Sequence, residues 1–483
     1  MITVLHPDRV LCGLAANPAL PAEPVDRLIA LAAATTDPSL AEDLAHELTD
    51  REGLDRPQLL ALAAAGEDAA AWLAQDGRLT AGDVDPEARP DAALALLERG
   101  EGRPHWARRF AADPDPGRRG RLAGCPDLPD DVLRRLGEDQ DPDVVAELAL
   151  AAPPALTAQL ARHPHTAVRR AVAFNDRTPP AVLAELLTGD DGSGREGITV
   201  AVLAHPALPA STAAGYADDP SPLVRAELAA RTDLPAEPYR RLAADPEPVV
   251  RRALAGNPAI DEEVIRVLAE DEDGDVGRQL CRHPRLPLDV LTGLAARARS
   301  LPILLPRVAA ASPAEVAELA VSAEPAVRML VAERRDLPPA IRDALAADPD
   351  AEVLKAIAPH PGLPEPLLRA MLTRHGVRVA ARMATNPDAS PALLTDLAHH
   401  RPPVRKALRE IARHPSAPPP ALAACLADGQ ARPIAAAHPS LPRSLLLDLL
   451  TGDHPHLAEV AAAHPSLPTE IARALVTHLT PTP

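Results

Sequence analysis

The chain has 483 residues with a formal net charge of −18, and this charge disfavours a general affinity for the phosphate backbone of nucleic acids. Only 1% of the residues are aromatic, so a core must be built from Leu, Val and Ala. No apolar run approaches the roughly 18 residues of a membrane span, and no basic segment followed by an apolar one opens the chain. We therefore expect a cytoplasmic, soluble protein, and the Ala, Pro and Arg usage indicates a GC-rich bacterial source.

The N-terminal part of the chain, at positions 1–110, shows a repeat only faintly. Asn17 opens the stretch NPALP, and the pair Asp37-Pro38 is suited to starting a helix. Helical segments are predicted at 58–65 and 92–99, but the positions that recur later in the chain cannot be aligned there. We interpret residues 1–110 as either degenerate helical repeats or an N-terminal cap.

A regular repeat occupies residues 111–483. Its clearest copies begin at His205, Arg231, Asn257 and His283, and the interval between them is constant. Leu, Ile or Val recurs at fixed positions in each copy. A period of about 26 residues is typical of a solenoid, in which one unit cannot bury its own apolar face and shares it with its neighbours. We expect the two end repeats to be irregular or capped.

Two short helices are predicted in each repeat. Pro209 and Pro235 suit the first turn of the first helix, because proline lacks the amide hydrogen that is unpaired there. The pairs Asp219-Pro220 and Asp245-Pro246 are predicted to start the second helix, with Asp as the N-cap. Apolar spacings of three and four, without alternation of period two, indicate helices rather than strands. The predicted fold class is all-α, a solenoid of short α-helices and 3₁₀-helices.

One insertion interrupts the period. The step from Asn175 to His205 is longer than the others, and its extra length lies in GDDGSGREG at 189–197, which we expect to be an exposed loop. The loop is acidic, but it lacks the alternating acids and the closing glutamate of an EF-hand. We predict no calcium site.

The repeat openings resemble those of the leucine-rich repeat variant family. They read HPALP at His205, HPRLP at His283, HPGLP at His360 and HPSLP at His438 and His464, and text such as LAADPEPVVRRALAGNP at 242–258 accompanies them. The resemblance covers roughly residues 111–480. It implies short α- and 3₁₀-helices in a right-handed superhelix, related in form to HEAT repeats, and no particular task. A member of that family has a cysteine-rich iron–sulfur cluster ahead of its repeats, but the isolated Cys12 does not match it, so no cofactor is expected.

Histidine and asparagine alternate at the opening position of the repeats. Both side chains can hydrogen-bond nearby backbone at a helix end, so we predict a structural role. Neighbouring repeats lie roughly 10 Å apart, too far for their histidines to share a zinc ion. The members are Asn17, Asn175, His205, Asn257, His283, His360, Asn386, His414, His438 and His464. The four cysteines, Cys12, Cys125, Cys281 and Cys425, are widely separated in the sequence, so no metal site is predicted.

Two groups of arginines are candidates for binding. The first follows a valine at Arg169, Arg225, Arg251, Arg328 and Arg405. We expect these arginines to pair with Asp or Glu of the same or the adjacent repeat, and the alternative is an edge that binds anions. The second group has two interleaved aromatic residues, and Arg and Trp are preferred interface anchors. We predict that it binds a partner; its members are Arg103, Trp106, Arg108, Arg109, Phe110, Arg118, Arg119 and Arg121.

No nucleophile elbow, zinc-protease motif, phosphate-binding loop or dinucleotide fingerprint occurs in the sequence. We therefore expect no enzymatic activity and predict a scaffold that binds another protein through a concave face or through the arginine-rich group. One alternative is a nucleic-acid-associated protein like the helical-repeat DNA glycosylases, which the acidic, aromatic-poor composition disfavours. Another is an accessory subunit of a biosynthetic or modification pathway.

Overall fold

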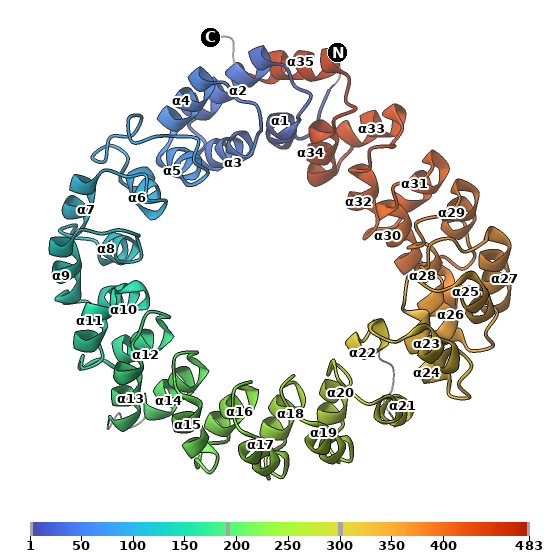
Figure 1. Ribbon diagram of the computed structural model, residues 1–483. Coiled ribbons are helices and arrows are strands. Elements are labelled where there is room, and N and C mark those ends of the chain that lie inside the picture. The colour runs from blue at the N-terminus through green and yellow to red at the C-terminus, as the bar shows by residue number, and fades with distance from the viewer. Residues whose placement is uncertain (1–2, 190–193, 298–302, 481–483) are drawn as a thin grey trace. The chain divides into compact units, whose positions relative to one another are not determined.

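The computed structural model describes residues 3–189, 194–297 and 303–480 (Figure 1). These residues form short helices joined by turns and contain no strand, so the all-α prediction is confirmed. The predicted 3₁₀ component is small: η2 (Ala214–Tyr216) continues the short helix α15 (Ala210–Ala213). None of the described helices is both long and apolar enough to cross a membrane.

The chain folds into two compact units. Unit 1 contains Met1–Ala112, Cys125–Pro129 and Leu372–Pro483, and unit 2 contains Asp113–Gly124 and Asp130–Met371. The sequence division at residue 110 therefore lies close to one boundary of unit 1. The same unit, however, also takes in the C-terminal segment Leu372–Pro483, which carries the regular repeat.

Unit 2 is built from two rows of helices. Helices of the first row pack closely on one another from α8 to α20 and again from α24 to α26, whereas those of the second row contact one another less. The first row comprises α8 (Pro116–Ala123), α10 (Pro142–Ala151), α12 (Thr166–Phe174), α14 (Arg195–Ala204), α16 (Pro222–Ala230), α18 (Pro248–Ala255), α20 (Gly274–Leu280), α24 (Pro325–Ala332) and α26 (Ala351–Ile357). The second comprises α9 (Asp130–Gly137), α11 (Pro154–Leu160), α13 (Pro180–Thr188), α15, α17 (Ala236–Ala243), α19 (Glu262–Ala269), α21 (Leu288–Arg297), α23 (Pro313–Ala320) and α25 (Pro339–Ala346). The short α22 (Pro306–Ala309) lies between α21 and α23, and α27 (Glu365–His375) spans the boundary of the two units.

Unit 1 has the same two-row construction, but its first row joins the two ends of the chain. That row runs through α28 (Val377–Met383), α30 (Arg405–Arg413), α32 (Arg432–Ala436), α34 (Pro455–Ala463), α1 (Pro7–Ala16), α3 (Pro38–Thr49), α5 (Glu67–Gln75) and α6 (Pro90–Glu98). The second row holds α29 (Pro391–Ala398), α31 (Pro419–Cys425), α33 (Arg443–Leu450), α35 (Thr469–Leu479), α2 (Ala22–Ala34), α4 (Arg56–Ala65) and α7 (Pro104–Phe110). Figure 1 shows α1 beside α34 and α2 beside α35.

The last repeat therefore stacks on the first. α1 packs extensively on α34, and α35 contacts both α1 and α2. The end repeats are not capped at this junction, because each end buries the apolar face of the other, whereas the alternative that they are irregular stays a prediction. Close approach depends on Gly13, where an added Cβ would lie 2.1 Å from the carbonyl oxygen of Glu459 and 2.8 Å from the Cβ of Ala462.

Side chains at the opening position connect many of the repeats to the one before, although the Nε2 atoms of His283 and His360 have no hydrogen-bond partner among the described residues. In His438, Nδ1 accepts the Ser440 N–H at 3.1 Å, so Nε2 carries the proton that it donates to the His414 carbonyl at 3.0 Å. His464 repeats this arrangement on His438, and His414 on Asn386. The Asn257 amide reaches the carbonyls of Ala229 and Arg231. The predicted hydrogen bond to nearby backbone is confirmed, and the bond to the preceding repeat is an addition.

The same bond crosses from one end of the chain to the other. Asn17 Nδ2 donates to the carbonyls of Ala462, at 2.8 Å, and His464, at 3.0 Å. Arginine also fills the opening position: Arg231 donates to the carbonyls of Leu203 and His205. The guanidinium of Arg231 reaches the same backbone carbonyls that a histidine or an asparagine reaches in other repeats. Three residue types can therefore make the same bond between repeats.

Substitution of Gly13 by Ala tests the junction of α1 and α34. Alanine stabilises an unconstrained helix interior by about 1 kcal/mol relative to glycine. We expect the opposite sign here, a loss of about 1–3 kcal/mol from overpacking, with a lower midpoint of thermal unfolding and faster amide exchange in α1 and α34. Gly293→Ala in α21 is the control, because its Cβ meets nothing within 4 Å. Equal stabilisation by both substitutions would show that the two helices do not pack as described.

Substitutions at His438 test the bond between repeats. His438→Asn is expected to retain stability within about 1 kcal/mol, because an asparagine amide can make both bonds, as at Asn257. His438→Leu leaves a buried carbonyl and an N–H unpaired and is expected to lower the free energy of unfolding by about 2–4 kcal/mol. Urea denaturation monitored by circular dichroism measures both. Comparable losses for the two variants would contradict the proposed role.

Candidate interaction surface

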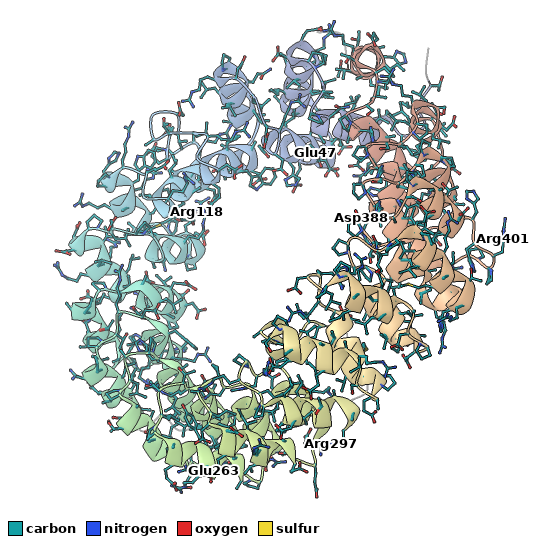
Figure 2. The ribbon with its side chains drawn as sticks, turned by 45° about the vertical axis from the view of Figure 1, so that its right-hand side comes forward. Glu47, Arg118, Glu263, Arg297, Asp388 and Arg401 are labelled. Atoms are coloured by element: carbon teal, nitrogen blue, oxygen red, sulfur yellow. The ribbon has the colours of Figure 1, made fainter. Side chains whose placement is uncertain are left out.

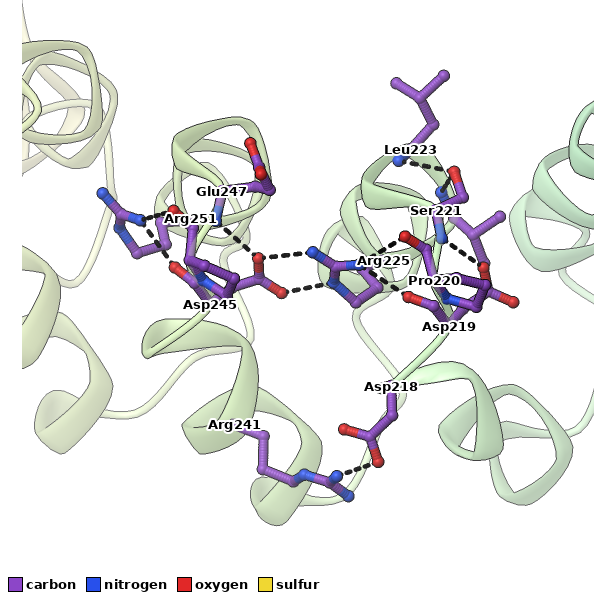
Figure 3. Close-up of polar contacts among 12 residues, drawn as sticks. Asp218, Asp219, Pro220, Ser221, Leu223, Arg225, Arg241, Asp245, Glu247 and Arg251 are labelled. Atoms are coloured by element: carbon purple, nitrogen blue, oxygen red, sulfur yellow. Dashed lines mark hydrogen bonds and ion pairs between the residues drawn. The ribbon is translucent and has the colours of Figure 1, made fainter.

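Three of the arginines that follow valine, together with Arg119, form an ion-pair series between successive repeats. Arg225 Nε lies 2.7 Å from Asp245 Oδ2, and Arg225 Nη2 lies 3.0 Å from Oδ1, while Nη1 donates to the Asp219 carbonyl at 2.7 Å (Figure 3). The pairs Arg119–Asp139, Arg251–Asp271 and Arg328–Asp348 have the same geometry. The prediction that these arginines pair with acids is confirmed for Arg225, Arg251 and Arg328, so their fork is not available to an external anion.

The aspartates of this series do not cap helices as predicted. α16 begins at Pro222 with Ser221 as its N-cap, and α18 begins at Pro248, two residues later than the sequence suggested. Asp245 instead accepts the Glu247 N–H and the Arg225 guanidinium. Burial raises the pKa of Asp245, but these hydrogen bonds outweigh it and leave the pKa below its usual value. The carboxylate is held by the fold and is not a reactive group.

The structure qualifies two further sequence predictions. Arg405 does pair with an acid of the adjacent repeat, Asp428, as predicted, but its side chain is 85% exposed and the distance from Nε is 3.9 Å, so it lacks the close two-bond geometry of the series. Arg195, Glu196 and Gly197 form the first turn of α14 rather than an exposed loop, because the helix begins at Arg195. Residues 190–193 of the predicted loop lie outside the described residues.

The aromatic residues of the predicted arginine-rich patch are core residues. Trp106 is 1% exposed and Phe110 is 0% exposed. Their apolar side chains fill the interior beneath α7, so the prediction that they anchor a partner is wrong. Arg103 stacks over the Trp106 ring, with its guanidinium carbon 5.8 Å from the ring centroid.

The arginines of that patch belong to two different units, and most of them have polar partners. Arg103, Arg108 and Arg109 belong to unit 1, whereas Arg118, Arg119 and Arg121 belong to unit 2. Arg109 pairs with Glu87, Arg118 with Asp113 and Arg119 with Asp139, while Arg108 and Arg121 also have polar partners. That these arginines bind a partner stays a prediction.

Two exposed apolar side chains on the first row of unit 2 are a stronger candidate. The residue just before the opening position is exposed and small in several repeats of this unit: Gly124, Ala204, Ala230 and Gly256. The neighbouring helices α10 and α12 place Leu150 and Phe174 there instead, 44% and 56% exposed. We call Leu150 and Phe174 the apolar pair. Figure 2 labels Arg118 on the first-row side of this unit and Glu263 on the second-row side.

A groove of about 530 Å³ lies between α8 and α10, the helix that carries Leu150. Its α8 side is lined by Gly117, Gly120 and Gly124, which leave room where other residues would carry side chains. Its α10 side presents Asp143 and Glu147. Arg121 of α8 also lines the groove, so its walls are polar on both sides, and Leu150 lies on the same helix as its acidic wall.

The part of the chain that the structure describes contains no group of three or more residues arranged to hold a metal. The four cysteines are buried, and none of them forms a disulfide. Burial raises the pKa of Cys12 to about 12 and that of Cys281 to about 11, which keeps both thiols protonated and unreactive at neutral pH.

Comparison with known proteins gives no family assignment. No family model matches the chain, and no curated protein matches it. One solved structure, described as a leucine-rich repeat variant with a novel repetitive protein structural motif, is 22% identical over 47% of this chain and 86% of its own, with a TM-score of 0.31. An engineered protein is 17% identical over 94% of this chain and 99% of its own, with a TM-score of 0.14. The helical-repeat architecture therefore rests on the helices and the bonds between repeats described above.

The exposed apolar residues were not singled out from the sequence. Phe174 directly precedes Asn175, and Leu150 occupies the equivalent position one repeat earlier. The signal was present, because a large apolar residue stands where other repeats have alanine or glycine. Recognising it required knowing that this position faces away from the neighbouring repeats, which the spacing of apolar residues does not reveal.

Acid titration tests the arginine–aspartate series. The hydrogen bond from Arg251 lowers the pKa of Asp271 below its usual 3.8. The pair thus stabilises the fold above that pH, and the contribution is lost as the pH falls through the lowered pKa. We expect Asp271→Asn to lower the free energy of unfolding by about 1–3 kcal/mol at neutral pH, and the difference to shrink as the pH falls through the lowered pKa of Asp271. Thermal unfolding across this range measures it. Asp176→Asn, at an exposed aspartate, is the control; equal behaviour of both variants would contradict the role of the pair.

Proposed function

We propose that this protein is a non-catalytic scaffold that binds another protein along the first-row face of unit 2. The observation that carries the proposal is the exposure of Leu150 and Phe174 at equivalent positions of two helices that pack on each other. Only 1% of the chain is aromatic, and both tryptophans and Phe110 are at least partly buried. A phenylalanine left 56% exposed in such a chain is therefore an exception that a partner would explain.

The polar side chains between the repeats support a role in binding rather than in catalysis. Several conspicuous titratable groups, among them His205, His414, His438 and His464 of the opening position and the aspartates of the ion-pair series, are engaged in hydrogen bonds between repeats. They hold the scaffold in place. What remains for recognition is the surface of the helices, and a stacked row offers a long, rigid one.

Site-specific cross-linking at Phe174 tests the proposal. We expect a photoreactive phenylalanine analogue placed there to capture a defined partner from native extract, and the Leu150→Asp substitution to weaken that capture by about 30-fold or more, the effect of losing an anchor of about 2 kcal/mol. Val267 on α19, 53% exposed in the second row, provides the matched control site and the matched Val267→Asp variant. Capture at Val267 equal to that at Phe174, or indifference to Leu150→Asp, would overturn the proposal.

A further inference from the structure

A second surface, independent of the apolar pair, lies on α28 and α30 in unit 1. These two first-row helices pack against each other. They contain six basic residues, Arg378, Arg382, Arg405, Lys406, Arg409 and Arg413, and one acid, Glu410, in a chain that has 68 acidic residues against 50 basic ones. The local charge is therefore opposite in sign to that of the whole protein.

Three of these cations have no partner within the described part of the chain. Arg378, Lys406 and Arg409 make no hydrogen bond or ion pair there, whereas Arg413 pairs with Glu410 at 3.3 Å. We call Arg378, Lys406 and Arg409 the basic patch. Arg378 and Lys406 each stand eight residues before the opening residue of the following repeat, so they occupy equivalent places on adjacent helices. Arg409 is one helical turn beyond Lys406, on the same face.

One hydrogen-bond donor of Arg409 has no acceptor in the part of the chain that the structure describes. Its Nε is buried, with no acceptor among the described residues. A buried donor without an acceptor is costly, and no contact within the described residues already uses this nitrogen. The guanidinium fork matches a carboxylate with two parallel hydrogen bonds.

The surroundings limit how much negative charge the patch can accept. Further along the same first row, beyond α32, lie Glu459 on α34 and Asp43 and Glu47 on α3, the last of which is labelled in Figure 2. A long polyanion that followed the row would meet these acids. Nucleic-acid binding typically uses about six to ten phosphate contacts. Three unpaired cations on two helices roughly 10 Å apart suit a short segment with two or three carboxylates.

We propose that the basic patch binds a short acidic segment of a partner protein, through the carboxylates of Asp or Glu. The patch and the apolar pair lie on different units, so this proposal does not depend on the function of the pair.

The test uses the full-length protein and a fluorescent peptide of alternating glutamate and glycine, read by fluorescence anisotropy at low and at physiological ionic strength. A glutamine–glycine peptide and a short single-stranded DNA are the comparison probes. We expect the glutamate peptide to bind more tightly than either, and its affinity to fall with salt. The triple variant Arg378→Gln, Lys406→Gln, Arg409→Gln is expected to weaken binding about tenfold or more, because each exposed ion pair contributes up to roughly fivefold in affinity.

Matched variants separate this effect from a general change of charge or fold. Arg443 on α33 and Arg473 on α35 are exposed second-row arginines of the same unit, and Arg443→Gln with Arg473→Gln is expected to leave the affinity unchanged. Because Arg409 is partly buried, the double variant Arg378→Gln, Lys406→Gln is measured as well and is expected to lose about threefold or more. Equal affinity in the patch and control variants, or tighter binding of DNA than of the glutamate peptide, would overturn the proposal.

Discussion

Many repeats of this protein share both an apolar face and a backbone carbonyl with the repeat before them. The carbonyl lies near a helix end, where no intrahelical partner is available, and a side chain of the following repeat donates to it. His438, His464 and Asn257 all do this, from the same position of the repeat. Since an unpaired buried carbonyl is costly, the opening position favours residues that carry a donor of suitable reach. That requirement explains why histidine, asparagine and arginine replace one another there.

The same constraint makes the junction of the chain ends a true repeat contact. Asn17 donates to the carbonyl of His464, as His464 itself donates to the carbonyl of His438, and Gly13 allows α1 to approach α34 closely. The first and last repeats of unit 1 therefore bury their apolar faces against each other. A solenoid whose ends were free would need polar capping repeats, and in this unit the two ends replace them.

Some charged side chains form bonds between repeats and so have a structural role, whereas others are left to bind a partner. In the ion-pair series an aspartate and two carbonyls satisfy the guanidinium, as Figure 3 shows for Arg225. Arg378, Lys406 and Arg409 are not used in this way, and neither are the side chains of Leu150 and Phe174. Both proposed surfaces consist of residues that the stacking of repeats does not require, on rows of helices that the stacking holds rigid.

The helical class, the period and the pairing of Arg225 and Arg251 with acids followed from the sequence, because local spacing of apolar residues, prolines and charges reflects contacts that recur at a fixed interval. The helix starts after Ser221 and Glu247 were missed by two residues, since Asp219 and Asp245 accept the N–H groups of Ser221 and Glu247 just ahead of the helices, and Asp245 also binds Arg225 of the preceding repeat. Only the tertiary structure showed that Trp106 and Phe110 are buried while Phe174 is exposed, and that residues near Gly13 meet residues near Glu459. Those facts depend on which helices become neighbours in space, and contacts between distant segments leave no periodic signal in the sequence.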